Sequence, residues 1–201
     1  MRRVPFRGRS LQKGHSGAFR GVAILEAAAA ILFFGILAGQ PELERCGTNA
    51  LHELAAHGYE IPTRSDPVRV YAARTEGSFS SSHAGGWRPG VISLRPNPRG
   101  DIHADAYLRH ELMHEASFRT CSEKLPLWAE EAAAMAFSGE LAVQSVAGPP
   151  SEIELDHLKK QARIGTGLDP GSNMSLARLV AVHGWPRQPC TVSAEIERLL
   201  R

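Results

Sequence analysis

Three features that the sequence lacks limit the kinds of fold and site it can form: it has few cysteines, no long apolar run and no internal repeat. Its three cysteines, Cys46, Cys121 and Cys190, form no C-x-x-C pair, which argues against a zinc site built from thiolates. In an oxidising compartment two of them can pair, and the sequence alone does not say which. A chain of 201 residues without repeats is expected to form one domain once any targeting segment is set aside.

Positive charge is also scarce beyond the first residues. The net charge is +2, yet residues 1–20 carry six Lys or Arg side chains and no acidic one, so the rest of the chain is slightly acidic. A protein that binds nucleic acid through its folded part usually presents a basic surface. We therefore expect no nucleic-acid partner.

The basic leader precedes an apolar segment that is short for a membrane span. The uninterrupted apolar run, Ala27–Gly39, has 13 residues, whereas a bilayer-spanning helix needs about 20. This pattern is typical of a signal peptide, and a signal anchor that stays in the membrane through residues 21–39 is the close alternative. A buried core helix is the third interpretation. Both targeting interpretations predict an exported protein, periplasmic or extracellular, with residues 1–40 as the leader and residues 41–201 as the folded domain.

Local patterns place strands early in the domain and helices late. Alternating apolar residues predict strands over 68–74 and 91–96, separated by a Gly- and Ser-rich loop at 77–90. Capping residues, including Thr48 or Asn49, Asp101 and the pair Ser151 and Glu154, mark helix starts. With apolar periodicity they predict helices over 50–57, 101–118, 126–137, 151–164, 174–184 and 191–201. Strands followed by helices indicate an α+β domain.

The segment "LRHELMHEAS" contains His-Glu-x-x-His at His110, Glu111 and His114, inside a predicted helix. Histidines at i and i+4 lie on one helix face, so both imidazoles can reach one metal ion. The glutamate beside the first histidine lies about 100° round the helix, where it can take a proton from a metal-bound water. The three residues therefore predict a hydrolytic zinc site.

A near-copy of this motif serves as an internal control. In "LHELAAHG", the residues His52, Glu53 and His57 have the spacing i, i+1, i+5. The two histidines are then about 140° apart on a helix and cannot easily bind one ion. We interpret them as ordinary helix residues.

A catalytic zinc site needs a third protein ligand, and the chain offers two neighbouring glutamates. The long metzincin pattern is excluded, because Ser117 and Thr120 stand where it has Gly and His. The helix predicted over 126–137 contains Glu130 and Glu131, which are about 100° apart, so only one of them can face the histidines. Periodicity leaves the choice open.

This part of the chain resembles the gluzincin metallopeptidases, in particular the peptidase MA-like group. In that group an H-E-x-x-H helix is followed by a helix that begins near P-x-W-x-x-E-G, whose glutamate completes the zinc site. Pro126, Trp128 and Glu131 match the second pattern, and Ala132 replaces its usual glycine. The match covers about residues 101–140.

The resemblance implies a small zincin-like domain, with a short antiparallel sheet, the H-E-x-x-H helix and following helices. It implies Zn²⁺ held by His110, His114 and Glu131, with Glu111 as general base and a peptide or protein as substrate. Because zincins commonly bind substrate as an added β-strand, it also implies such a role for residues 90–95.

Two other functions remain open at this point. A non-catalytic zinc module would close the fourth metal position with a ligand such as Glu130 or His157. An envelope-assembly protein with a degenerate peptidase fold is the second, although the intact Glu111 argues against it, because a structural site has no use for a general base.

The leader generates a first prediction. A reporter fused after Gln40 is expected to be active only outside the cytoplasm, because both targeting interpretations export whatever follows the apolar segment. The same reporter without residues 1–40 is the control and should stay inside. Activity of the full fusion in the cytoplasm would contradict export.

Overall fold

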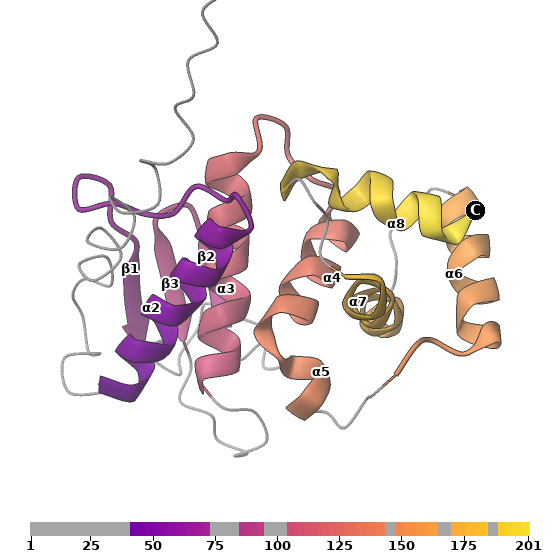
Figure 1. The fold of residues 1–201 in the computed structure, drawn as a ribbon, viewed down its shortest axis with the longest axis horizontal. Helices are drawn as coiled ribbons and strands as arrows, with labels where there is room; N and C mark the ends of the chain where they lie inside the picture. The colour runs from indigo at the N-terminus through magenta and orange to yellow at the C-terminus, as the bar shows by residue number, and fades with distance from the viewer. Residues whose placement is uncertain (1–40, 73–84, 95–103, 144–147, 165–169, 185–188) are drawn as a thin grey trace, which may run out of the picture.

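A computed structural model describes residues 41–72, 85–94, 104–143, 148–164, 170–184 and 189–201. The leader and its apolar segment lie outside these residues. A small sheet with two helices forms one part of the domain, and further helices form the other (Figure 1). The predicted α+β class is therefore confirmed. Among the described helices, none has the length and apolar character that crossing a bilayer requires.

The sheet consists of three short strands in the order β1-β3-β2. Their bounds are Arg69–Ala72 for β1, Gly85–Arg88 for β2 and Val91–Leu94 for β3. β3 pairs in parallel with β1 and antiparallel with β2, so the sheet is mixed, not wholly antiparallel as expected. β2 falls inside the stretch predicted to be a loop, because two of its four residues are glycines and give no apolar alternation.

The position of β3 also corrects the strand expected to bind substrate. Residues 90–95 were expected to receive an added strand, but β3 lies between β1 and β2 and has a partner on each side. Within the described residues β1 and β2 are the two edge strands, and β2 is the one that packs against the motif helix α3. Arg88 and Val91 flank the two-residue turn of the hairpin, so their main chains hydrogen-bond to each other. In an antiparallel pair hydrogen-bonded and non-hydrogen-bonded pairs alternate, so the main chain of Trp87 is not hydrogen-bonded to that of Ile92. The main-chain N–H and C=O of Trp87 therefore point to the outer edge.

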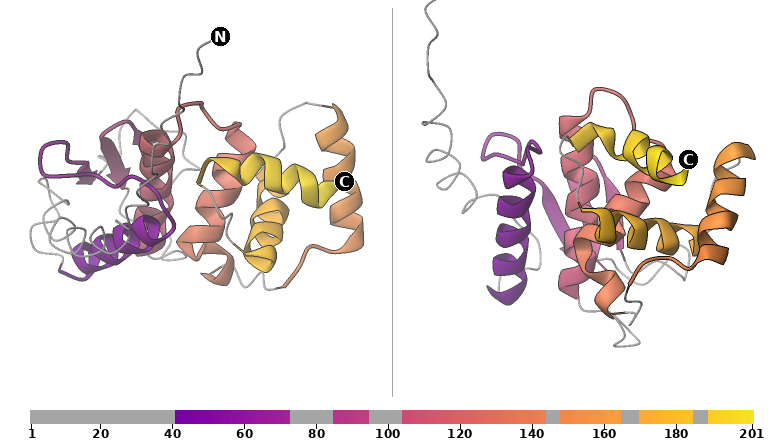
Figure 2. Two further views of the ribbon diagram at one scale, coloured as in Figure 1. Left: turned by 45° about the horizontal axis from the view of Figure 1, so that its top comes forward. Right: turned by 45° about the vertical axis from the view of Figure 1, so that its right-hand side comes forward.

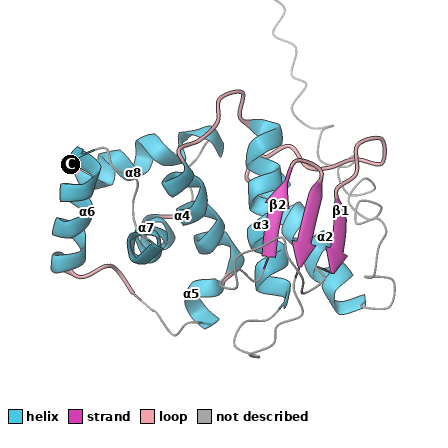
Figure 3. Ribbon diagram, turned by 180° about the vertical axis from the view of Figure 1, so that it is seen from behind, coloured by secondary structure: helices cyan, strands magenta, loops and turns pink. Residues whose placement is uncertain are grey.

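Two helices lie on one side of this sheet (Figure 3). α2 (Pro41–Ala56) begins well before the expected start near residue 50, because proline suits a first helical turn. Thr48 does not cap it; its hydroxyl donates to the carbonyl oxygen of Glu44 inside the helix at 2.9 Å. α3 (Ala104–Thr120) carries the H-E-x-x-H motif and packs against α2, β2 and β3.

The helices that follow α3 lie on its other side (Figure 2). The elements are α4 (Leu127–Ser138), α5 (Glu140–Val143), α6 (Glu152–Ile164), α7 (Pro170–His183), the 3-10 turn η1 (Pro189–Thr191) and α8 (Val192–Leu200). The predicted capping box opens α6, since the N–H of Ser151 donates to the Glu154 carboxylate at 2.7 Å. In return the N–H of Glu154 donates to the Ser151 hydroxyl at 3.3 Å.

α4 is the central helix and packs against α3, α7 and α8. Four of its alanines are fully buried: Ala129, Ala132, Ala133 and Ala134. Small side chains let neighbouring helices approach closely, which is how the metal-motif helix comes within reach of α4. Ala132, which stands where the gluzincin pattern has glycine, is accommodated in this core.

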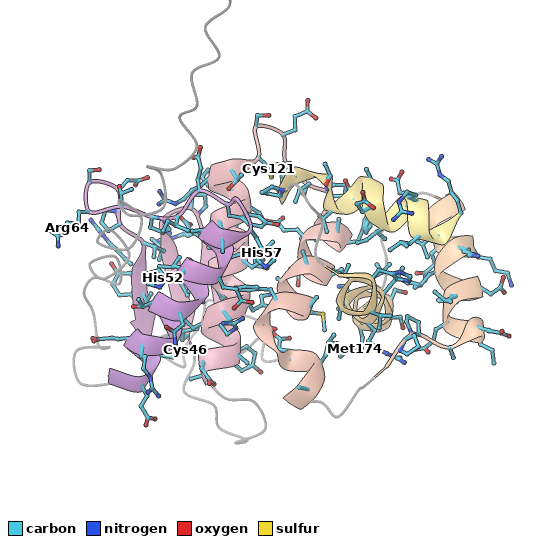
Figure 4. The ribbon with its side chains drawn as sticks, viewed as in Figure 1. Cys46, His52, His57, Arg64, Cys121 and Met174 are labelled. Atoms are coloured by element: carbon cyan, nitrogen blue, oxygen red, sulfur yellow. A yellow bond between two sulfur atoms is a disulfide. The ribbon has the colours of Figure 1, made fainter. Side chains whose placement is uncertain are left out.

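A disulfide joins Cys121, just after α3, to Cys190, just before α8, across 69 residues of sequence. Figure 4 shows Cys121 where the end of α3 meets the start of the C-terminal segment. The remaining thiol, Cys46, donates a weak hydrogen bond to the carbonyl oxygen of Asp105 at 3.8 Å. Burial, reinforced by the nearby Asp105 carboxylate, raises the pKa of Cys46 and disfavours its reactive thiolate.

This arrangement predicts how the cysteines react. Iodoacetamide should modify the folded protein slowly at neutral pH, because Cys46 is half-buried and its pKa is raised. In denaturant without reductant, mass spectrometry should find a single alkylated cysteine at Cys46. Prior reduction should expose the other two as well. Alkylation of Cys121 or Cys190 without reduction would contradict the disulfide.

Candidate metal centre

The i, i+4 spacing of His110 and His114 brings their rings together on α3. Their Nε2 atoms lie 3.1 Å apart, and the ring centroids are 4.9 Å apart in an edge-to-face arrangement. His114 is 6 % exposed. Two imidazole nitrogens thus face one point in a largely buried space, as the motif predicted.

α4 supplies a carboxylate to the same point. The two helices run antiparallel: Arg109, near the start of α3, donates to the carbonyl oxygen of Phe137, near the end of α4, at 3.0 Å. This direction places the first turns of α4 beside His114. Oε2 of Glu131 lies 3.4 Å from Nε2 of His110, and its Oε1 lies 3.4 Å from Nε2 of His114.

The ring nitrogens and carboxylate oxygens of this cluster have pairwise separations close to those of ligand atoms around a tetrahedral zinc ion. Bonds of 2.0–2.1 Å at the tetrahedral angle place two ligand atoms about 3.3–3.4 Å apart. The two Nε2 atoms lie 3.1 Å apart, and each lies 3.4 Å from a different oxygen of Glu131. The residues His110, His114 and Glu131 therefore form a candidate metal-binding group, and they are the three that the sequence and the resemblance predicted.

Glu130 takes a different place from its neighbour. Its Oε1 lies 3.3 Å from Nδ1 of His114, on the ring nitrogen that faces away from Glu131. It is buried, with 7 % of its surface exposed. The choice between the two glutamates thus matches the prediction, and Glu130 holds His114 in orientation from the outer side.

Glu140, which the sequence analysis missed, does the same for the other histidine. Its Oε1 lies 2.8 Å from Nδ1 of His110, and it is 6 % exposed. Gly139 ends α4 in the left-handed conformation, with φ of 85°, and the chain then turns into α5 with Glu140 at its start. No spacing rule links Glu140 to the motif, although the glycine was a visible signal for the end of α4.

Charge complementarity accompanies this geometry. Burial opposes a charged imidazole, but the hydrogen bonds that the ring donates to Glu131 and Glu140 outweigh it and raise the pKa of His110 to about 10. The pKa of His114 is also raised: burial opposes this, and the hydrogen bonds that its ring donates to Glu130 and Glu131 outweigh burial. The pKa of Glu131 is lowered, because its hydrogen bonds to both histidines overcome its own burial.

Glu111 lies beside the cluster, and the structure does not include it among the ligands. It is 7 % exposed. Burial raises the pKa of its carboxyl, while the two histidines act in the opposite direction. A carboxylate with raised proton affinity next to a metal-binding group has the character that a general base needs.

The remaining candidates do not join this cluster. Glu53 of the near-copy forms an ion pair with Arg109 at 2.7 Å. His157 lies on α6 and hydrogen-bonds Gln161 at 2.9 Å. Over the described part of the chain, the metal-binding group has three members, so no fourth protein ligand closes it there.

The geometry predicts opposite results for one substitution at adjacent positions. Glu131→Gln should abolish stoichiometric zinc binding, because it removes the ligand charge. Glu130→Gln should retain one ion per chain and weaken the affinity by no more than about 10–100-fold, as for outer-shell partners. Elemental analysis and zinc titration measure both. The reverse pattern would show that Glu130 is the ligand.

Comparisons with known proteins provide no relative from which the role of this centre could be inferred. The chain matches no protein-family model, and neither the curated proteins nor the solved structures contain a significant match. The candidate metal centre is therefore supported by the spacing of its motif and by the convergence of its side chains.

Proposed function

We propose that this chain is an exported zinc-dependent peptidase of gluzincin type, in which His110, His114 and Glu131 hold the ion. The observation that carries the proposal is the convergence of these three ligands on one point beside Glu111. Three protein ligands leave one tetrahedral position for water or substrate, which is the arrangement of catalytic zinc sites. The proposal also accounts for Glu130 and Glu140, because ligand histidines usually donate their second N–H to a carboxylate.

Each side chain then has a chemical task. When bound, zinc lowers the pKa of a coordinated water toward about 7 and polarises the carbonyl of the substrate. Glu111 accepts the proton of the attacking water and returns it to the leaving amine, which suits a carboxylate whose pKa is raised by burial. Glu130 and Glu140 keep the two imidazoles in the tautomer that presents Nε2 to the ion.

The edge strand β2 is the best place for a peptide substrate. The outward N–H and C=O of Trp87 can pair with an extended peptide, as in other cases of strand addition. The Trp87 ring stacks on His114, with centroids 5.9 Å apart, so this edge runs beside the metal centre. β2 thus takes the role first expected for residues 90–95.

The two alternatives fit the site less well. A purely structural zinc module would close the coordination with a fourth protein ligand, and in the described chain Glu130 and His157 are both engaged elsewhere. An assembly protein with a degenerate site would have no need to retain Glu111 beside a complete ligand set. The Cys121–Cys190 disulfide favours an oxidising compartment and so supports export.

The division of labour between Glu111 and the ligands gives the decisive test. Glu111→Gln should keep one zinc ion per chain and reduce cleavage of a mixed peptide library by roughly 10²–10⁴-fold, because only the general base is lost. His110→Ala should lose both the ion and the activity. Chelation of zinc should abolish cleavage, and added zinc should restore it.

Two results would count against the peptidase. If Glu111→Gln stays fully active on a substrate that the wild-type protein cleaves, Glu111 is not the base. If the zinc-loaded wild-type protein cleaves nothing in the library, the degenerate-site alternative is favoured.

A further inference from the structure

Glu115 is a buried carboxylate of α3 that the metal chemistry does not use. It directly follows His114, and its surface is 1 % exposed. Its Oε2 accepts hydrogen bonds from Nε1 of Trp87 at 2.7 Å and from the main-chain N–H of Gly90 at 2.9 Å. Its Oε1 accepts from Nε of Arg119 at 2.7 Å. Both oxygens of a buried charge are thus occupied by donors.

These contacts tie the metal helix to the hairpin formed by β2 and β3. Burying a carboxylate is unfavourable unless an opposite charge and hydrogen bonds compensate for it. Arg119, one helical turn further along α3, supplies that charge and forms a second ion pair with Asp66, just before β1. The hairpin contributes the other two donors, one from the edge strand and one from its turn.

The place of Glu115 on the helix connects it with the proposed chemistry. Residues four apart share a helix face, so Glu115 lies one turn beyond Glu111 on the same side. The indole that it holds belongs to Trp87, whose ring stacks on His114 with an interplanar angle of 27°. One carboxylate therefore sets the position of β2 relative to both Glu111 and a metal ligand.

We propose that Glu115 is a positioning residue for substrate: it fixes the outer edge of β2 so that a peptide paired with this edge presents its scissile bond to the metal centre. This inference rests on the proposed peptidase function. It assigns Glu115 no contact with the ion or with the reacting atoms, so its loss should alter substrate alignment while zinc stays bound.

Two substitutions weaken this link while keeping a polar or an aromatic side chain in place. In Glu115→Gln an amide NH₂ replaces one oxygen, so it must face either Arg119 or the hairpin donors, and a donor then meets a donor. Trp87→Phe keeps an aromatic ring over His114 but lacks the indole N–H. Glu123→Gln, the same change at an exposed position between α3 and α4, is the matched control.

Three measurements on the zinc-loaded full chain test the inference. Zinc content should remain one ion per chain in all variants. Amide hydrogen exchange over residues 85–94 should become faster in Glu115→Gln and Trp87→Phe, and stay unchanged in Glu123→Gln. The value of kcat/KM should fall roughly 10–100-fold in Glu115→Gln, the size expected when a reacting group is misplaced by about 1 Å. The double variant should lose little more than Glu115→Gln alone, because both changes break one link.

The outcomes separate this inference from the proposed function. Unchanged exchange over residues 85–94 in Glu115→Gln would overturn the inference, whether or not the protein is a peptidase. Faster exchange or a lower melting temperature with unchanged kcat/KM would also overturn it, since Glu115 would then serve stability alone. A wild-type protein that binds zinc and cleaves no peptide would overturn the proposed function, and the exchange result would still show whether Glu115 holds the hairpin.

Discussion

Two imidazoles share a buried space with several carboxylates between α3 and α4, and opposite charge is what makes that burial tolerable. Glu131 faces the inner nitrogens of both rings, while Glu130 and Glu140 hold the outer ones. The raised pKa of His110 reflects these carboxylates, which favour positive charge on its ring. A divalent cation held there would supply positive charge to the same carboxylates.

The antiparallel packing of α3 on α4 brings this charge balance about. Buried alanines on α4 keep the helices close, and Arg109 fixes the register by binding the carbonyl oxygen of Phe137. Gly139 then ends α4 in a conformation that glycine adopts without strain. The chain turns back there, which places Glu140 against His110. Small residues and one turn thus decide where the carboxylates lie.

Local rules anticipated the parts of the site that lie within one helix. The spacing of His110 and His114 follows from helix geometry, and Ser151 with Glu154 gave a correct helix start. The choice of Glu131 needed a family resemblance, because both glutamates of α4 are suitably placed on the helix. Glu140 and Glu115 were missed because their roles depend on contacts between separate elements, and the periodicity of a helix or strand does not reveal such contacts. β2 was missed because a strand with two glycines has no alternation to detect.

The 17-residue helix α3 presents functional candidates on two different faces. His110 and His114 lie on the face toward α4, and Glu115 faces the hairpin. Glu111 shares the side of Glu115 and lies about 100° from His110. It therefore stands between the candidate metal ligands and the edge strand, where the proposed peptidase would bring a peptide paired with β2 to the ion. In a small domain, carrying the candidate metal ligands and the contact to the hairpin on one rigid helix keeps the distance between them independent of loop movement.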